Sequence, residues 1–258
     1  MKKIFFVALA LLAFAFIGCK KEKVEINSVA DLAGKKIGVQ TGTTGETWVS
    51  ENVENVKLSS FKTGIDAALD LKNGAIDAVV LDELPAKEIV ARNSDLKIIR
   101  DQTFADNKEE YAIAVKKGNT ELLESINKTI TDMKNNGDYE KLVSAFMPVD
   151  GNIKIPENEG TSGDEIVKLG TNAAFPPFEY VDGKSVVGFD ITMGQKIAKT
   201  AGKKLEVVDM AFDSLIPALQ SGTIDFIAAG MSVTEERKKN VDFSVPYFQS
   251  EQVIIVRK

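Results

Sequence analysis

The sequence predicts an α/β fold of two similar, doubly wound lobes joined at a hinge, and two observations support this fold class. The stretch Leu71–Asp82 aligns without a gap with Leu219–Gly230, and each copy reads as a helix end, a glycine and a short apolar strand. Another apolar strand pattern precedes each copy, at 36–40 and 167–171. Strands that alternate with helical patterns predict βαβ units and a parallel sheet. Two copies therefore predict two α/β lobes.

Composition excludes several kinds of chemistry. The chain has 258 residues, 44% of them apolar and 27% charged, as in ordinary globular proteins with room for two modest cores. Its net charge of −6 does not suit nucleic-acid binding, which needs a basic surface. Without histidine, and with a single cysteine, the chain cannot form a Ser-His-Asp triad, a His-ligated zinc site or an intramolecular disulfide. We expect no metal, no cofactor and no nucleic-acid partner.

The first residues resemble a secretion signal. A basic Met1–Lys3 precedes an apolar run, Ile4–Ile17, that is too short to span a bilayer as a helix. The only cysteine, Cys19, follows Phe16–Gly18 in a pattern similar to a bacterial lipobox. We therefore expect a signal peptide over 1–18 and a lipidated tether over 19–27. The alternative is a free cysteine that stands at the end of a signal by chance.

The remaining chain divides into two lobes in sequence order. We expect lobe 2 over residues 28–109 and lobe 1 over residues 110–258, with a hinge crossing at 110–115. After that crossing, Leu122, Leu123, Ile126, Ile130 and Met133 recur at helical spacing, and a second helix stops at Pro148. Residues 149–165 are rich in Gly, Asn, Glu, Pro and Ser, which indicates a solvated linker.

Candidate binding residues come from one rule, because doubly wound sheets bind ligands at the carboxyl ends of their strands. Asp82 and Gly230 occupy the same place in the two copies, so one lobe offers a carboxylate where the other offers bare backbone. Applied to both lobes, and with the aromatic side chain upstream of the second copy added, the rule selects Gln40, Thr43, Thr44, Asp82, Asn172, Phe175, Phe212, Gly230, Ser232 and Arg237.

Each of these residues also has an ordinary structural interpretation. Thr43–Glu46 predicts an anion seat at a helix N-terminus or a simple N-cap, and Ser232–Glu235 has the spacing of a capping box. Arg237 is one of only four arginines, and its planar fork suits a carboxylate, although it can equally pair with the glutamates beside it. Asp82 can be a turn residue, and the phenylalanines can be core.

Taken together, the selected residues have complementary charges. They comprise a cation and an anion seat for one carboxylate, an anion for one ammonium group, and aromatic faces for a side chain. This combination is a complete receptor for a zwitterionic α-amino acid. The absence of histidine, and of an evident second acid near the pocket, disfavours an enzyme.

At these residues the sequence closely resembles the polar amino-acid family of extracytoplasmic solute-binding proteins that serve ABC importers. The resemblance covers about Ser28 to Lys258 except the linker, and its motifs are Gly38–Glu46, Ala78–Pro85, Gly170–Tyr180, Val187–Asp190, Phe212–Leu219 and Met231–Lys238. It implies a type II periplasmic-binding-protein fold and a lipid-anchored monomer at the cell membrane, facing the periplasm or exterior. The implied partners are a free amino acid and the permease subunits of an ABC importer.

The resemblance also implies a role for each site residue. Arg237 is expected to grip the ligand α-carboxylate, with help from Thr44 and Ser232. The α-ammonium group is expected to bind Asp82 and the carbonyl of Gly230, while Phe175 and Phe212 enclose the side chain. Asn172 and Gln40 leave the side-chain pocket uncharged, which favours a neutral or amide side chain. A dehydratase-like enzyme, and a sensor or adhesin lipoprotein on the same fold, are the alternatives.

Segment order departs from the family pattern. Family members normally begin with the stretch that matches Gly170 onward and end with the one that matches Tyr139–Phe146, whereas here the latter half comes first. The chain therefore looks like a circular permutant whose usual termini are joined by the 149–165 linker. We expect each lobe to be continuous in sequence and only one covalent crossing to remain. Val245 also replaces an aspartate that is common in the family, so we expect no polar role at that position.

Overall fold

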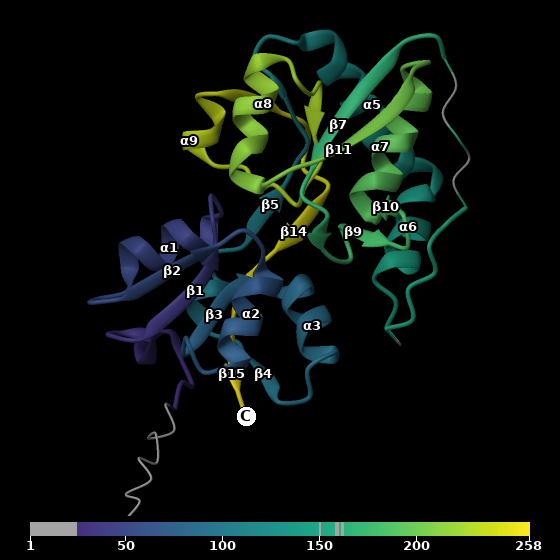
Figure 1. Cartoon of the computed structure of the whole chain (residues 1–258). Helices are drawn as coiled ribbons and strands as arrows, with labels where there is room; N and C mark the ends of the chain where they lie inside the picture. The colour runs from purple at the N-terminus through teal and green to yellow at the C-terminus, as the bar shows by residue number, and fades with distance from the viewer. Residues whose placement is uncertain (1–24, 150, 158–159, 161–162) are drawn as a thin grey trace, which may run out of the picture.

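The computed structural model describes residues 25–258 except 150, 158–159 and 161–162 (Figure 1). The expected signal peptide over 1–18, Cys19 and the first part of the tether lie outside the described residues, as do parts of the linker. Among the described residues, no helix combines the length and apolar character that a membrane crossing requires.

Lobe 2 is built on a sheet with strands in the order β2-β1-β3-β15-β4. Strands β1, β2 and β3 run parallel, and β15 lies antiparallel between β3 and β4. The strand bounds are β1 Lys36–Gln40, β2 Lys57–Phe61, β3 Ala78–Asp82, β4 Leu96–Ile99 and β15 Gln252–Arg257. The helices of this lobe are η1 Val29–Leu32, α1 Thr44–Asn52, α2 Gly64–Lys72, α3 Glu83–Ala91 and α4 Gln102–Ala105.

Lobe 1 repeats this plan with the order β11-β7-β12-β6-β13, in which β6 is the antiparallel strand. Its strands are β6 Ala114–Lys116, β7 Ile166–Thr171, β11 Lys204–Asp209, β12 Phe226–Ile227 and β13 Val241–Phe243. A small sheet of β8 Ala174–Phe175, β9 Glu179–Asp182 and β10 Ser185–Val187 stands beside it. The helices are α5 Thr120–Asn136, α6 Asp138–Phe146, α7 Phe189–Thr200, η2 Phe212–Ser214, α8 Leu215–Ser221 and α9 Glu235–Lys238.

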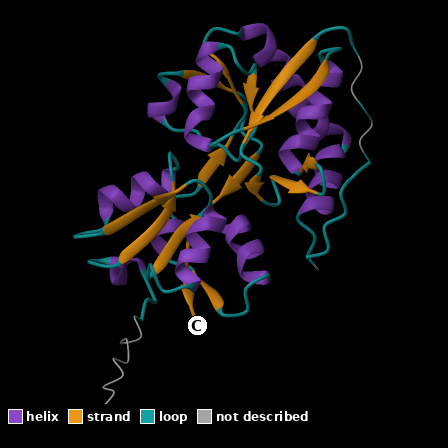
Figure 2. Cartoon of the chain, in the orientation of Figure 1, coloured by secondary structure: helices purple, strands orange, loops and turns teal. Residues whose placement is uncertain are grey.

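Helices cover both faces of each main sheet, as Figure 2 shows. In lobe 2 the side chains of β3 alternate in their partners: Val80 belongs to the core cluster that contains Val49 of α1, whereas Val79 belongs to the cluster that contains Leu71 of α2. This period of two places one helix layer on each face. The predicted fold class, two doubly wound α/β lobes, is confirmed.

The internal repeat extends to individual packing contacts. A Cβ atom on Gly38 of β1 would lie 2.5 Å from Cδ1 of Ile76, and one on Gly170 of β7 would lie 2.2 Å from Cδ1 of Ile224. Because both positions lack a side chain, Ile76, just before β3, packs directly on β1, and Ile224, just before β12, packs directly on β7. The same glycine–isoleucine contact in both lobes supports the alignment of the two copies.

The expected lobe boundary is wrong at the C-terminal strand. The sequence predicts that residues 110–258 form lobe 1, but β15 lies inside the sheet of lobe 2, where Val253, Ile254 and Ile255 are fully buried. The chain therefore crosses between the lobes twice, and lobe 2 is discontinuous in sequence. The crossings run side by side as an antiparallel pair, β5 Glu109–Tyr111 with β14 Phe248–Ser250, which Figure 1 shows between the lobes. The expectation of a single covalent crossing is also wrong.

Candidate functional site

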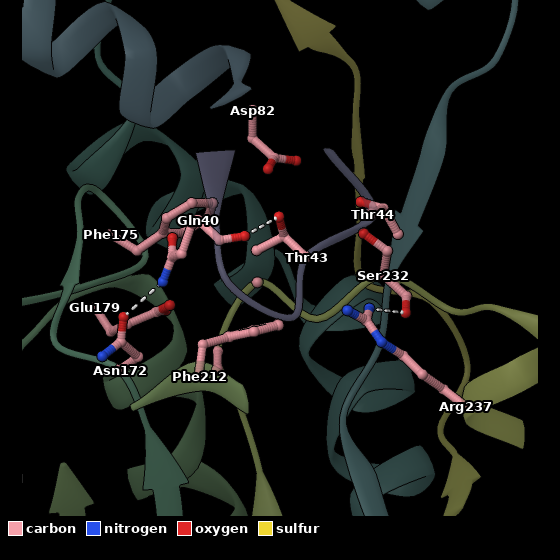
Figure 3. A pocket seen from close by; sticks show the side chains of 12 residues that line it. Gln40, Thr43, Thr44, Asp82, Asn172, Phe175, Glu179, Phe212, Ser232 and Arg237 are labelled. Carbon is pink, nitrogen blue, oxygen red and sulfur yellow. Dashed lines mark hydrogen bonds between the residues drawn. The ribbon is translucent and has the colours of Figure 1, made fainter. Parts of the chain in front are cut away.

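A small cavity lies between the two lobes, and the structure brings all ten of the predicted binding residues to its wall (Figure 3). Glu179 and Ala229, which the sequence analysis did not select, line it too. The cavity volume is only about 10 Å³, room for about one water molecule. An amino acid is far larger, so the lobes must separate before one can enter.

The carboxyl ends of the strands position the lobe 2 residues of this wall. Gln40 ends β1, Asp82 ends β3, and Thr43 caps α1, which begins at Thr44. The hydroxyl of Thr43 donates to the carbonyl of Gln40 at 2.7 Å and accepts the N–H of Glu46 at 3.3 Å. Its hydroxyl proton is therefore used within the turn, and the ordinary N-cap interpretation of Thr43 is confirmed.

Two side chains at equivalent places in the two lobes meet across the cavity. Gln40 lies two residues beyond Gly38, and Asn172 lies two residues beyond Gly170. The amide of Gln40 donates to Oδ1 of Asn172 at 2.9 Å, as Figure 3 shows. Both side chains are buried. The amide pair therefore joins the lobes at one side of the cavity.

Arg237 spans the lobes on the other side. Its guanidinium donates to the carbonyl of Ser232 at 2.6 Å and, across the cleft, to the carbonyl of Gly42 at 3.0 Å. Its Cζ atom lies 5.4 Å from the centre of the Phe212 ring. These bonds use two of the five N–H donors of the Arg237 guanidinium.

The structure contradicts both ordinary structural interpretations of the segment around Arg237. Glu235 and Glu236 form ion pairs with Lys238 and Lys239, not with Arg237. The expected capping box at Ser232 is wrong as well, because Thr234 is the N-cap of α9 and its hydroxyl accepts the N–H of Arg237. Ser232 lies in the preceding segment, where it forms an isolated β-bridge with Tyr111, and its hydroxyl is directed elsewhere.

Asp82 is a buried carboxylate, 6% exposed. It accepts the hydroxyl of Tyr111 at 2.6 Å and that of Ser250 at 3.3 Å, so both hinge strands hold it. Burial, followed by the nearby negative charge of Glu109, raises the pKa of Asp82 to about 7, against the opposing bond from Tyr111. A cation placed beside Asp82 would favour its ionised form.

A second pair of acids lies beneath the cavity. Asp190 accepts the N–H of Gly230 at 2.9 Å and the hydroxyl of Tyr247 at 2.7 Å. Burial raises the pKa of Asp190 to about 6, while burial and the charge of Asp190 raise the pKa of Glu179 well above its usual range. A proton held on Glu179 lets the two buried acids lie close together with a single negative charge between them. Through Gly230, this pair fixes a segment of the cavity wall.

These acids correct the expectation that no second acid lies near the pocket. Glu179 is part of the predicted Gly170–Tyr180 motif, where it is a lone charge in an apolar run, and that contrast was the available signal. No comparable sequence signal marks Glu109, at the start of β5, because its partners come from distant segments of the chain.

The Glu179 proton has a measurable effect on stability. The folded state binds this proton more tightly than the unfolded state, so its stabilising effect is full below the ordinary pKa of 4.5 and is lost as pH rises. Glu179→Gln carries a fixed N–H in its place, and we expect its stability to fall less steeply than that of the wild type between about pH 5 and pH 8. Urea unfolding at several pH values measures this difference.

The matched control for that experiment is Glu206→Gln. Glu206 lies on the surface of lobe 1, where its half-exposed side chain stands 3.9 Å from Lys168. We expect this variant to keep the pH profile of the wild type. Equal profiles for Glu179→Gln and the wild type would contradict the interpretation that Glu179 holds a proton in the folded state.

Comparison with known proteins shows which family part of the chain matches. Residues 167–258 match the bacterial extracellular solute-binding proteins, family 3. The arginine-binding extracellular protein ArtP of Bacillus subtilis (strain 168) is 45% identical over 102 residues, which are 39% of this chain and 40% of that protein. The L-cystine-binding protein TcyJ of Escherichia coli (strain K12) is 32% identical over 125 residues, 48% of this chain and 46% of that protein.

A solved structure of an ancestral arginine-binding protein bound to arginine is 56% identical where it aligns. The alignment covers 32% of this chain and 37% of that one, with a TM-score of 0.32. The chain thus spans less than half the length of the relatives named here. Over residues 167–258 the chain therefore matches family 3 of the bacterial extracellular solute-binding proteins, and its similarity to the named relatives is limited to segments of comparable length.

Proposed function

We propose that this protein captures a free L-α-amino acid between its lobes and delivers it to the permease of an ABC importer. One observation carries the proposal: a buried carboxylate, Asp82, and a guanidinium, Arg237, line the same cavity from opposite lobes. The two charges of an α-amino acid are complementary to them. Because each lobe supplies one of these groups, the ligand gains its full set of contacts only when the lobes close.

The remaining wall suits a side chain. Phe175 and Phe212 offer apolar faces, and the Gln40–Asn172 pair offers amide groups that can exchange their mutual bond for bonds to a ligand. We propose a neutral or amide side chain on this basis. The named relatives bind arginine or cystine, so cationic and larger amino acids belong in the same screen.

A thermal-shift screen of the twenty amino acids tests this function. A ligand that binds only the folded form raises the melting temperature, by an amount that grows with its concentration above Kd. We expect at least one free amino acid to do so, and the same amino acid at the same concentration to shift Arg237→Ala less. A screen in which no amino acid shifts the wild-type transition would reject the proposed function.

The location and the chain order are proposals as well. A lipid on Cys19 would tether the mature protein outside the cytoplasmic membrane, next to its permease. A circular permutation accounts for the segment order, and the place of β15 supports it: this strand and the first described residues belong to the same lobe. In the usual family order, the strand equivalent to β15 would run directly into the segment that begins at about residue 24.

A further inference from the structure

The strand β5, which crosses between the lobes, carries the carboxylate of Glu109 next to two residues of the cavity wall. Glu109 of β5 accepts the hydroxyl of Thr44 at 2.7 Å, the hydroxyl of Ser232 in a shorter bond, and the amide of Gln252 at 3.2 Å. Thr44 belongs to lobe 2, Ser232 to lobe 1, and Gln252 begins β15 of the lobe 2 sheet. One carboxylate thus joins the two lobes at the hinge.

The hydroxyls of Thr44 and Ser232 can each donate to only one acceptor at a time. A serine or threonine hydroxyl has a single proton to donate. Thr44 and Ser232 both donate theirs to Glu109, so neither can donate to another carboxylate at the same time. These are the two hydroxyls that the family resemblance leads us to expect at the α-carboxylate of the ligand.

The electrostatic surroundings point the same way. Glu109 is close enough to Arg237 to raise its pKa, against the larger lowering by burial, and close enough to Asp82 to raise the pKa of that acid. A ligand carboxylate that approached Arg237 would therefore meet the negative charge of Glu109 as well as hydroxyls that are already engaged. Two carboxylates at one anion seat repel each other.

We propose that Glu109 is a built-in competitor that occupies the α-carboxylate seat and sets the affinity for the ligand. This inference rests on the proposed function. When an amino acid enters, its carboxylate accepts the hydrogen bonds of the Thr44 and Ser232 hydroxyls, and the side chain of Glu109 turns away from both. The same bonds join the lobes, because Thr44 and Ser232 belong to different lobes.

The isosteric variant Glu109→Gln removes the charge and retains the shape. A neutral acceptor binds a hydroxyl less strongly than a carboxylate does, so the competitor is weakened. We expect Glu109→Gln to bind its amino acid about tenfold more tightly than the wild type, as measured by calorimetry with L-arginine and L-glutamine as probes. Equal or weaker binding by the variant would overturn the proposal, because it would make Glu109 a support of the ligand site.

Glu110→Gln is the matched control. Glu110 is the next residue of the same strand, and its side chain is exposed to solvent. This variant carries the same change of charge one position away, and we expect its affinity to equal that of the wild type. A gain of affinity in both variants would mean that overall charge, not the contact with Thr44 and Ser232, is responsible, and this result would also overturn the proposal.

A measurement without ligand keeps this inference separate from the proposed function. Glu109→Ala removes both hydroxyl contacts between the lobes, so small-angle scattering should give a larger radius of gyration for this variant than for the wild type. An unchanged radius would overturn the proposal. If the wild type bound neither probe, the screen of the proposed function would decide that function, and the scattering result would decide the role of Glu109.

Discussion

Replacing Arg237 with alanine is expected to weaken amino-acid binding about a hundredfold. The variant leaves the α-carboxylate of a bound ligand without a cation in a closed site, and the loss of one partner of a buried charge pair costs about 2–5 kcal/mol. Arg237 also donates to the carbonyls of Gly42 and Ser232, so its loss weakens the contact between the lobes as well. Titration calorimetry at pH 8 measures the change.

Two further variants give this experiment its specificity. Arg237→Lys keeps the charge but loses the planar fork, and we expect an intermediate loss of affinity. Arg92→Ala removes an arginine whose side chain is 71% exposed and 3.7 Å from Glu88, and we expect no change. If Arg237→Ala bound as tightly as Arg92→Ala, Arg237 would not be a ligand group.

Asp82→Asn is expected to separate binding from stability. The asparagine oxygen can still accept the hydroxyls of Tyr111 and Ser250, but it cannot neutralise an ammonium group. We expect affinity at pH 8 to fall at least about thirtyfold. Because burial and Glu109 disfavour the ionised carboxyl, we expect the melting temperature at pH 8 to stay the same or rise.

The pH dependence of binding gives a second test of Asp82. Below its pKa of about 7 the carboxyl is neutral, so the wild-type affinity should fall about tenfold from pH 8 to pH 6. The groups that face Asp82 are Tyr111, Ser250, Glu109 and Gln252. In Asp82→Asn this part of the pH dependence should disappear. A variant that is destabilised, yet binds normally, would indicate a purely structural role for Asp82.

The sequence carried enough information to predict the lobes and the wall of the cavity. Both depend on local patterns: apolar strands, helix ends and the rule that ligands lie at the carboxyl ends of parallel strands. The repeat around Gly74 and Gly222, which both adopt positive φ angles after a helix, marks the same turn in each copy. Such features require only neighbours in the chain.

What could not be predicted depends on distant pairing. The apolar run at Gln252–Arg257 indicates a strand but not the sheet that receives it, because β3 and β4 lie far away in the chain. Glu109 likewise meets partners 65 and 123 residues away. Side-chain contacts of this kind follow from the closed arrangement of the lobes, which no local pattern encodes.

The central claim is that both lobes together neutralise the two charges of one free amino acid. A crystal structure of the complex with the amino acid that gives the largest thermal shift tests it most directly. We predict the ligand carboxylate within about 3 Å of the Arg237 guanidinium, and the ligand ammonium group within about 3 Å of the Asp82 carboxylate. A ligand bound elsewhere, or one held with either charged group turned away from these two side chains, would contradict the claim.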